Sequence, residues 1–288
     1  MTVYPDSGKA LSSVNVAVTE YQGELDPVPT GVFNDNSWSI ISMIAERGTG
    51  PSYWSVGDRK AVILNGTVGD KTFNNTTTYC FILGFDHNKS IEHPNSHAIH
   101  IGFGASALSG GAYIAYCDSK YYNHVSSTGY FSMNSSDDNR GGWNGKDGTG
   151  CQMKKYICPA FKNALPSNLK SHIRAVTKWQ NDGASTSGQS SFNEIWLLSE
   201  MEIFGSAPYS NYTANQLQYD FYKGVTGWSA APTIRYKDTS TSTGAIWWTR
   251  SAYAHSISYF STVTAGGGGK AGYSSCNNSL GFAPCLCL

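Results

Sequence analysis

The sequence predicts a single α+β domain in which two amphipathic helices pack on a twisted, mostly antiparallel sheet. Three observations lead to this class. Short strand-like runs are separated by turns rich in Gly, Asn and Asp. Residues 152–178 repeat apolar side chains at three- and four-residue steps, as amphipathic helices do. The chain of 288 residues is long enough to bury a substantial core.

An extended N-terminal arm is expected over residues 1–36, ahead of one domain that spans residues 37–288. The arm is inferred from short β-prone pieces that alternate with prolines and glycines. The rest of the chain shows neither a repeat at a fixed period nor a linker that would split it into equal domains. Such an arm would serve as an attachment segment.

A short helix and three strands are predicted in the first part of the domain. Ile40, Met43 and Ile44 share one helical face, and Gly48 stands where a C-cap belongs. After a turn at residues 53–58, alternating and β-branched residues favour strands joined as hairpins. The strand-like runs are residues 60–64, 77–85 and 97–103.

Two consecutive amphipathic helices are predicted between residues 152 and 178. Pro159 lacks the amide that an interior helical turn needs, so it should kink or restart the first helix. Pro166 stands near the start of the second helix, with Ser167 beside it as a possible cap. The stripe of the second helix consists of Leu169, Ile173 and Val176.

The last fifth of the chain is expected to lie at the centre of the core. Trp247 and Trp248 are adjacent, and aromatic surface of that size drives its own burial. An apolar terminal strand closes the sequence after Gly281. Ahead of this section, strands are predicted at residues 194–198 and 201–204, and a short helix at residues 216–222.

The composition argues against several classes of partner. With 20 basic and 20 acidic side chains the formal net charge is zero, so no field attracts nucleic acid or an anionic membrane surface. No apolar run reaches the ~20 residues that cross a bilayer, and the N-terminus shows no signal-peptide pattern. The 31 Gly and 18 Tyr are typical of a loop-rich surface protein instead. We therefore expect a partner other than nucleic acid, and no membrane insertion.

The seven cysteines are interpreted as buried free thiols. They are odd in number and form no C-x-x-C pair, which argues against a complete disulfide framework and against a zinc ribbon. Four histidines lie close together beside Asp86 and Glu92, and they raise the question of a metal site. His97 and His100, however, differ by three positions and would face opposite sides of a strand. The preferred interpretation is a polar turn with no bound metal.

Other catalytic patterns are incomplete. Glu200 and Glu202 would share one strand face, but nothing selects them as a glycosidase pair. The sequence has no nucleophile elbow, and its acidic loop at residues 137–147 is explained by side chain to backbone bonds more readily than by calcium. We therefore expect no catalytic residues, no cofactor and no metal.

Candidate binding residues are sought in two loops, at residues 121–130 and 266–278, because exposed tyrosines stack on sugars or anchor protein interfaces. A second group of residues is expected to be structural. The candidate binding residues are Tyr121, Tyr122, Tyr130, Lys270, Tyr273 and Asn277. The expected structural residues are Trp143, Trp247, Trp248 and Arg250.

Several motifs, taken in order, resemble an uncharacterised domain family of gut bacteria, their prophages and their phages. Its matching pieces run from about residue 37 to residue 288, so the resemblance covers nearly the whole chain. They include Tyr53-Trp54-x-x-Gly57-Asp58, Ile82-x-Gly84-Phe85-Asp86-His87, Gly141-Gly142-Trp143, Ile195-Trp196-Leu197-Leu198-Ser199-Glu200, Trp247-Trp248-x-Arg250-Ser251 and Gly281-Phe282-x-Pro284.

The Trp-x-Arg-Ser and Gly-Phe-x-Pro pieces also look like the closing strands of C-type-lectin-like domains. That resemblance implies a C-type-lectin-like α+β fold, shared by formylglycine-generating enzymes and by the variable tropism proteins of phages. Ala283 stands where those domains usually have Arg, and Cys285-x-Cys287 is not the paired-cysteine arrangement of the enzymes. Their activity is therefore not carried over.

The expected function is that of a non-catalytic bacteriophage virion protein, displayed on the capsid or tail as a decoration or host-attachment module. Its expected partners are other virion proteins, further copies of itself in a homo-oligomer, and a host surface glycan or protein. Assembly would take place in the cytoplasm of the bacterial host. Two alternatives stay open: an enzyme related to formylglycine-generating oxidases, which would need reactive Cys285 or Cys287, and a bacterial surface adhesin.

Overall fold

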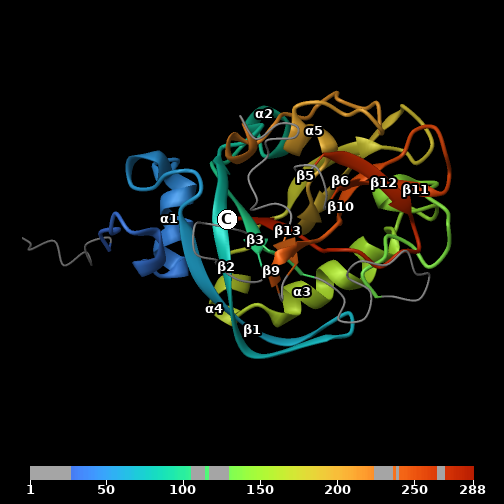
Figure 1. The fold of residues 1–288 in the computed structure, drawn as a ribbon. Coiled ribbons are helices and arrows are strands. Elements are labelled where there is room, and N and C mark those ends of the chain that lie inside the picture. The colour runs from blue at the N-terminus through green and yellow to red at the C-terminus, as the bar shows by residue number, and fades with distance from the viewer. Residues whose placement is uncertain (1–26, 105–113, 117–129, 224–235, 238–239, 265–269) are drawn as a thin grey trace, which may run out of the picture.

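The computed structural model describes residues 27–104, 114–116, 130–223, 236–237, 240–264 and 270–288 (Figure 1). In these residues helices accompany sheets that are antiparallel except for one short parallel pair, which confirms the α+β class. The helical segments are η1 Phe33–Asp35, α1 Trp38–Arg47, η2 Gly50–Ser52, α2 Lys89–Glu92, η3 Gly142–Asn144, η4 Met153–Ile157, α3 Cys158–Ala164, α4 Ser167–Lys170, α5 Glu200–Phe204 and η5 Asp220–Tyr222. The strands are β1 Arg59–Val68, β2 Lys71–Phe85, β3 Ile99–Gly104, β4 Ile114–Ala115, β5 Val176–Asn181, β6 Gly188–Asn193, β7 Ile195–Leu197, β8 Tyr236–Lys237, β9 Ser240–Gly244, β10 Trp247–Ala252, β11 Tyr259–Val263, β12 Ala271–Ser275 and β13 Pro284–Cys287.

The main sheet has the order β1-β2-β3-β13-β7, so the last strand of the chain lies inside it. Cys285 pairs with Gly102 of β3 on one side and with Trp196 of β7 on the other. All six residues of β3 and all four of β13 are buried. The prediction of a central, buried C-terminal strand is confirmed. The predicted hairpin is also confirmed, although β1 and β2 are both longer than predicted.

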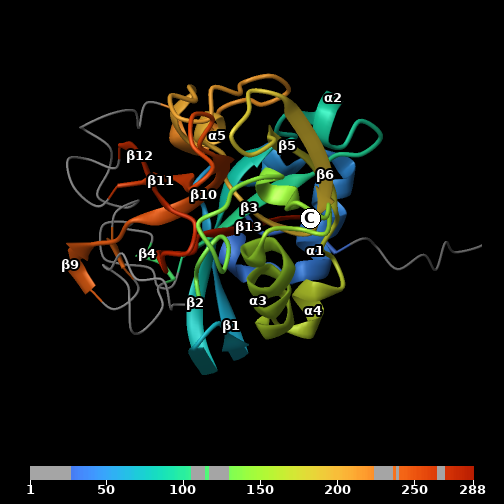
Figure 2. The ribbon, with the colours of Figure 1, turned by 90° about the vertical axis from the view of Figure 1, so that its right-hand side faces the viewer.

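A second sheet, of order β10-β11-β12, lies beside the main sheet (Figures 1 and 2). Trp247 pairs with Val263, and Tyr259 pairs with Ser275 across the next ladder. Every residue of β10 is buried, and the amide of Arg250 donates to the Leu198 carbonyl, just after β7. This bond ties the second sheet to the end of the main sheet. Two smaller sheets, of order β4-β8-β9 and β5-β6, complete the arrangement.

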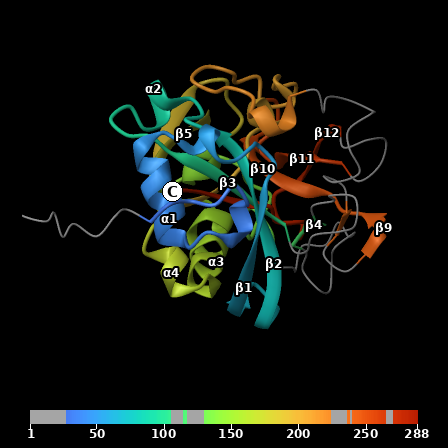
Figure 3. The ribbon, with the colours of Figure 1, turned by 90° about the vertical axis from the view of Figure 1, so that its left-hand side faces the viewer.

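Helix α1 forms where the sequence predicts it. The Ser37 hydroxyl accepts a hydrogen bond from the Ile40 amide at the N-terminus, and Gly48 ends the helix with a left-handed φ of 68°. The helix buries Trp38, Ile41 and Ile44. In the described part of the predicted arm, Phe33 is 2% exposed and packs against Trp54. Figure 3 shows α1 in front of the main sheet when the molecule is seen from this side.

The prediction of a second long helix is wrong beyond residue 170. The first helix does restart at Pro159, where the π-turns of η4 give way to α3, and α3 packs along β1. After Pro166, helix α4 has only four residues, and its start carries no capping bond from a side chain. Residues from Val176 onward form β5, because Val176, Lys178 and Gln180 are buried at a period of two. The spacing of apolar residues did not reveal this period, because two of the three buried residues, Lys178 and Gln180, are polar.

Residues 201–204 are helical, so the strand predicted there is also wrong. A capping box begins α5: the Ser199 hydroxyl accepts from the Glu202 amide, and the Glu202 carboxylate accepts from the Ser199 amide. Gly205 ends α5 in the left-handed region. The strand predicted at residues 194–198 is confirmed as β7. Of the helix predicted at residues 216–222, only the last three residues are helical, as the short 3-10 turn η5. In the part of the chain that the structure describes, no helix is long and apolar enough to cross a membrane.

Candidate functional site

The described structure offers two candidate sites: a buried ionic cluster and an exposed group of tyrosines. The ionic cluster consists of Glu92, Lys178, Glu202 and Arg250. Arg250 of β10 donates to both carboxylate oxygens of Glu202 in α5, and both side chains are fully buried. The guanidinium also donates to the backbone carbonyls of Leu197 and Trp179. It therefore ties the capping residue of α5 to three strands.

Lys178 joins the second half of the ionic cluster. Its ammonium donates to Glu92 at 2.6 Å, to Glu202 at 3.1 Å and to the Tyr219 hydroxyl at 2.8 Å. It also lies 4.5 Å from the centre of the Trp196 ring, within cation–π range. Since Lys178 has no exposed side-chain surface, these partners replace the water that it loses.

A chain of histidines leads into the ionic cluster. His93 and His100 approach at 3.1 Å between their Nε2 atoms, and His100 Nδ1 lies 2.8 Å from the Tyr219 hydroxyl. His87 stacks on the Tyr219 ring at 3.6 Å between centroids. His97, in contrast, pairs with Asp86 nearer the surface. His97 and His100 therefore belong to different sites, although His97 precedes β3 and does not face the opposite side of that strand as predicted.

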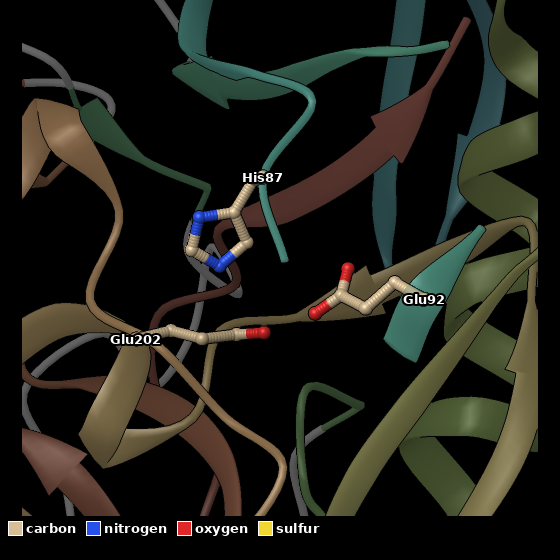
Figure 4. A group of neighbouring side chains, drawn as sticks. All are labelled: His87, Glu92 and Glu202. Atoms are coloured by element: carbon tan, nitrogen blue, oxygen red, sulfur yellow. The ribbon is translucent and has the colours of Figure 1, made fainter. Parts of the chain in front are cut away.

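One group in this region has metal-ligand chemistry. Figure 4 shows the His87 ring directed toward the carboxylates of Glu92 and Glu202, and one ligand atom of each residue lies within 4.8 Å of the others. Lys178, however, already donates to both carboxylates, and Arg250 neutralises Glu202. With both carboxylates ionised, the four charges of the ionic cluster sum to zero, and a divalent cation would then add uncompensated buried charge. The arrangement favours a structural ion network over a metal centre.

The pKa values of these groups follow from burial and pairing. Burial raises the pKa of Glu92 to about 7, against the effect of Lys178. Burial acts in the same direction on Glu202, but Arg250 and Lys178 outweigh it and lower its pKa to about 2. Burial, assisted by Lys178, lowers the pKa of His87 to about 3. The imidazole is therefore neutral near pH 7.

The second feature is a partly exposed aromatic group that we call the tyrosine patch: Tyr209, Tyr253, Tyr259 and Tyr273. The Tyr253 and Tyr273 rings are parallel within 4°, with centroids 4.9 Å apart. Tyr209 meets Tyr273 edge-on at 5.1 Å, and Tyr259 lies 5.2 Å from Tyr273. Tyr273 is 49% exposed and contacts the other three rings, so it is the centre of the patch.

Tyr259 and Tyr273 of the patch lie on strands β11 and β12, and the loops that carry Tyr209 and Tyr253 are held from beneath. Asn139 is fully buried, and its side-chain amide lies within hydrogen-bond distance of the carbonyls of Tyr253, Ser256 and Tyr259. The Tyr253 amide donates to the Tyr259 carbonyl and closes the loop. The Ala254 amide donates to the Tyr209 carbonyl, which joins this loop to that of Tyr209. The backbone under the rings is therefore set before any partner arrives.

A buried carboxylate fixes the Tyr209 loop. Glu200 accepts from the amides of Tyr209 at 3.3 Å and Ser210 at 2.8 Å. Burial raises the pKa of the Glu200 carboxyl. Glu200 and Glu202 thus leave α5 toward different partners, one under the tyrosine patch and one in the ionic cluster. They do not form a glycosidase pair.

Of the candidate binding residues from the sequence, only Tyr273 belongs to the tyrosine patch. Tyr121 and Tyr122 lie outside the described residues. Tyr130 is 56% exposed, beside the buried Phe131, whereas Lys270 and Asn277 are half-buried on either side of β12. Sequence reasoning missed Tyr209, Tyr253 and Tyr259. The available signal was the pair Tyr253 and Tyr259 around a short Ser- and His-containing turn next to a strand.

The four residues expected to be structural all lie in the interior. Trp143 and Trp248 are 0% exposed and Trp247 is 2% exposed. The Trp143 indole donates to the Asn193 side chain, and that of Trp248 donates to the Phe131 carbonyl. Arg250 is the buried cation of the ionic cluster. None of the four reaches the tyrosine patch as an exposed side chain.

The cysteines and the acidic loop show no catalytic arrangement in the described residues. Six cysteines are free and buried, as predicted, and Cys117 lies outside the described range. Burial raises the pKa of Cys287 to about 12 and that of Cys285 well above its usual value. In the loop at residues 137–147, Asp138 pairs with Arg140 and Lys146, and Asp147 accepts from Thr149. These oxygens face separate partners rather than one cation.

Comparison with known proteins gives one family. A search of curated proteins finds no match, and a search of solved structures finds none either. Residues 132–288 match the family described as a domain of unknown function, DUF6273. The match covers more than half of the 288-residue chain. It includes Asn139, all of the tyrosine patch and the ionic cluster, of which only Glu92 lies outside. On this evidence the chain belongs to the DUF6273 family.

Proposed function

We propose that this chain is a non-catalytic attachment module of a bacteriophage virion, displayed on the capsid or tail, and that the tyrosine patch is its contact surface. The observation that carries the proposal is the rigid presentation of four packed tyrosines. Exposed aromatic side chains offer large contact area at little cost in conformational entropy, which suits them to recognition. Asn139 and Glu200 hold the loops beneath them, which lowers the cost further.

The virion setting is supported by composition and resemblance. The zero formal charge and the high Gly and Tyr content suit a surface protein that does not bind nucleic acid. The motifs between about residue 37 and residue 288 resemble an uncharacterised domain family of gut bacteria, their prophages and their phages. Its partners in this setting would be other virion proteins and further copies of itself.

A distant C-type-lectin-like relationship fits the same proposal. The Trp-x-Arg-Ser piece is the buried strand β10 and the Gly-Phe-x-Pro piece leads into the central strand β13. The turn at residues 253–259 and strand β12 lie between them in the sequence, and β12 stands where a loop was predicted over residues 266–278. Core strands that frame exposed loops are a common way to present a binding surface on a rigid scaffold.

The enzymatic alternative has less support. An oxidase related to the formylglycine generators needs a reactive thiolate, yet Cys285 and Cys287 are 2% and 0% exposed, with raised pKa values. A bacterial surface adhesin would use the same tyrosine patch and differs only in where the chain is displayed. The two settings are separated by locating the protein.

Mass spectrometry of purified phage particles, from a strain that encodes this gene, tests the virion setting. Copy number is compared with that of the major capsid protein. A stoichiometric signal is the expected result, with high copy pointing to capsid decoration and low copy to a tail tip. Absence from particles, with the protein found on the bacterial surface, would replace the virion by the adhesin.

A further inference from the structure

We infer that the tyrosine patch binds a neutral pyranose sugar, held by ring stacking and hydrogen bonds without a metal ion. This inference rests on the proposed function only in taking the tyrosine patch as the contact surface. It adds the chemical class of the ligand, which neither the family match nor the motifs provide.

The size of the tyrosine patch favours a small ligand. A whole tyrosine side chain has about 200 Å² of surface, so Tyr273, at 49% exposure, offers about 100 Å². The other three tyrosines are only partly exposed and together add about 100 to 200 Å². A stable protein interface covers about 800 Å² on each partner. The patch is several times too small for that, but it is large enough to cover one face of a sugar ring.

The chemistry of the patch matches a sugar. A pyranose has an apolar face of C–H groups and a rim of hydroxyls, and each tyrosine offers an apolar ring and a hydroxyl. Polar groups stand beside the rings: His255 lies 5.8 Å from the Tyr253 ring, and its Nε2 is 2.6 Å from the Asn211 side-chain nitrogen. Both side chains are exposed and are positioned to contact sugar hydroxyls.

The groups described in and beside the tyrosine patch favour a neutral sugar. Tyr209, Tyr253, Tyr259 and Tyr273, with Asn211 and His255 beside them, include no Asp, Glu, Lys or Arg. The one carboxylate described above as lying beneath these loops, Glu200, is 0% exposed and accepts from two backbone amides. A sugar acid or a phosphorylated sugar would find no cation among these residues. A calcium-held sugar would find no exposed carboxylate among them.

The test is saturation-transfer NMR on the purified full chain with the methyl glycosides of glucose, galactose, mannose and N-acetylglucosamine at millimolar concentration. We expect at least one glycoside to receive saturation mainly on one ring face, and the signal to persist in EDTA. Tyr273→Ala should weaken binding at least tenfold, whereas Tyr273→Phe should retain most of it. Tyr156→Ala is the matched control, because Tyr156 is 60% exposed on η4, outside the patch.

The thermal unfolding midpoint of each variant shows whether it is folded. If Tyr273→Ala is unstable, Tyr209→Ala is the alternative variant of the patch. The inference is overturned if no glycoside binds, if binding survives the Tyr209→Ala/Tyr273→Ala double substitution, or if Tyr156→Ala weakens it equally. A protein ligand would show itself as particle adsorption that needs Tyr273 while no glycoside binds. In that case the proposed attachment function is supported and the inference that the ligand is a sugar is overturned. Glycoside binding by a protein absent from particles would support the sugar site and overturn the virion setting.

Discussion

Arg250 donates to both carboxylate oxygens of Glu202, and neither side chain reaches solvent. The pair connects β10 to the first turn of α5, whose start depends on the same Glu202 carboxylate. Removing one partner of a buried ion pair leaves the other charge without compensation.

Arg250→Met should therefore lower the free energy of unfolding by about 3–5 kcal/mol, measured by urea denaturation. The matched control is Arg140→Met, because the Arg140–Asp138 pair has an arginine side chain that is 58% exposed. That substitution should change the free energy of unfolding far less, because solvent screens an exposed ion pair. Equal effects of the two substitutions would mean that the ionic cluster does not organise the core.

Acid should destabilise the fold. Burial lowers the pKa of His87 to about 3 and that of His100 well below 6.5, so both side chains gain protons on unfolding below pH 6.5. Burial raises the pKa of Glu92 to about 7 and also raises that of Glu200, so these two carboxyls oppose the change above about pH 4.5. Below about pH 4.5 both carboxyls are protonated in the folded and unfolded states alike, and the uptake of protons by the two histidines remains. The unfolding free energy should therefore fall as the pH drops from about 4.5 to 3.

Urea titrations at several pH values measure this slope. His87→Asn should flatten it, because the folded state then no longer excludes that proton. Unfolding free energy that increases on acidification over this range would mean that the histidines are already charged in the native state.

The thiols should be inert in the native protein. Cys80, Cys151, Cys158, Cys276, Cys285 and Cys287 are all buried, with pKa values raised by burial. Iodoacetamide followed by peptide mass spectrometry should modify none of these six before unfolding and all of them in urea. Rapid modification of Cys285 and Cys287 in the folded chain would instead support thiol chemistry.

Asn139 should control the rigidity of the tyrosine patch. Asn139→Ala removes the side chain that contacts the carbonyls of Tyr253, Ser256 and Tyr259. The loss of a buried hydrogen-bonding group costs about 1–3 kcal/mol, and amide exchange should accelerate first at residues 253–259. Asn168→Ala, at an exposed position of α4, is the control and should change neither quantity. Amide exchange that accelerates uniformly across the chain would indicate that Asn139 stabilises the whole fold rather than this loop alone.

Much of the architecture was accessible from sequence where local signals and burial agreed. The α1 helix shows this, since its apolar spacing and its terminal Gly48 both point to the observed helix. So does β13, whose apolar residues suit the centre of a sheet. The prediction failed at β5, because Lys178 and Gln180 are buried by distant polar partners that no local pattern reveals. It failed at α5 as well, where the Ser199 and Glu202 capping box outweighed the apolar run.

The candidate site was less accessible than the fold. Tyr273 could be chosen because the sequence around it is rich in Gly and Ser, but Tyr209 is 64 residues away in the sequence. The two rings meet only because the Ala254 amide binds the Tyr209 carbonyl and Glu200 fixes the following turn. Lys178 and Glu92 are similarly 86 residues apart. Polar contacts between residues so far apart in the sequence form only when the whole chain has folded, so no local sequence pattern predicts them.

The tyrosine patch is tested most directly by the adsorption rate of phage particles whose copy of this protein carries Tyr209→Ala and Tyr273→Ala. Particles with Tyr156→Ala serve as the control, and mass spectrometry confirms equal incorporation. We predict at least a tenfold slower adsorption of the double variant to host cells and an unchanged rate for the control. Unchanged adsorption of fully incorporated double-variant particles would contradict the assignment of the tyrosine patch as the attachment surface.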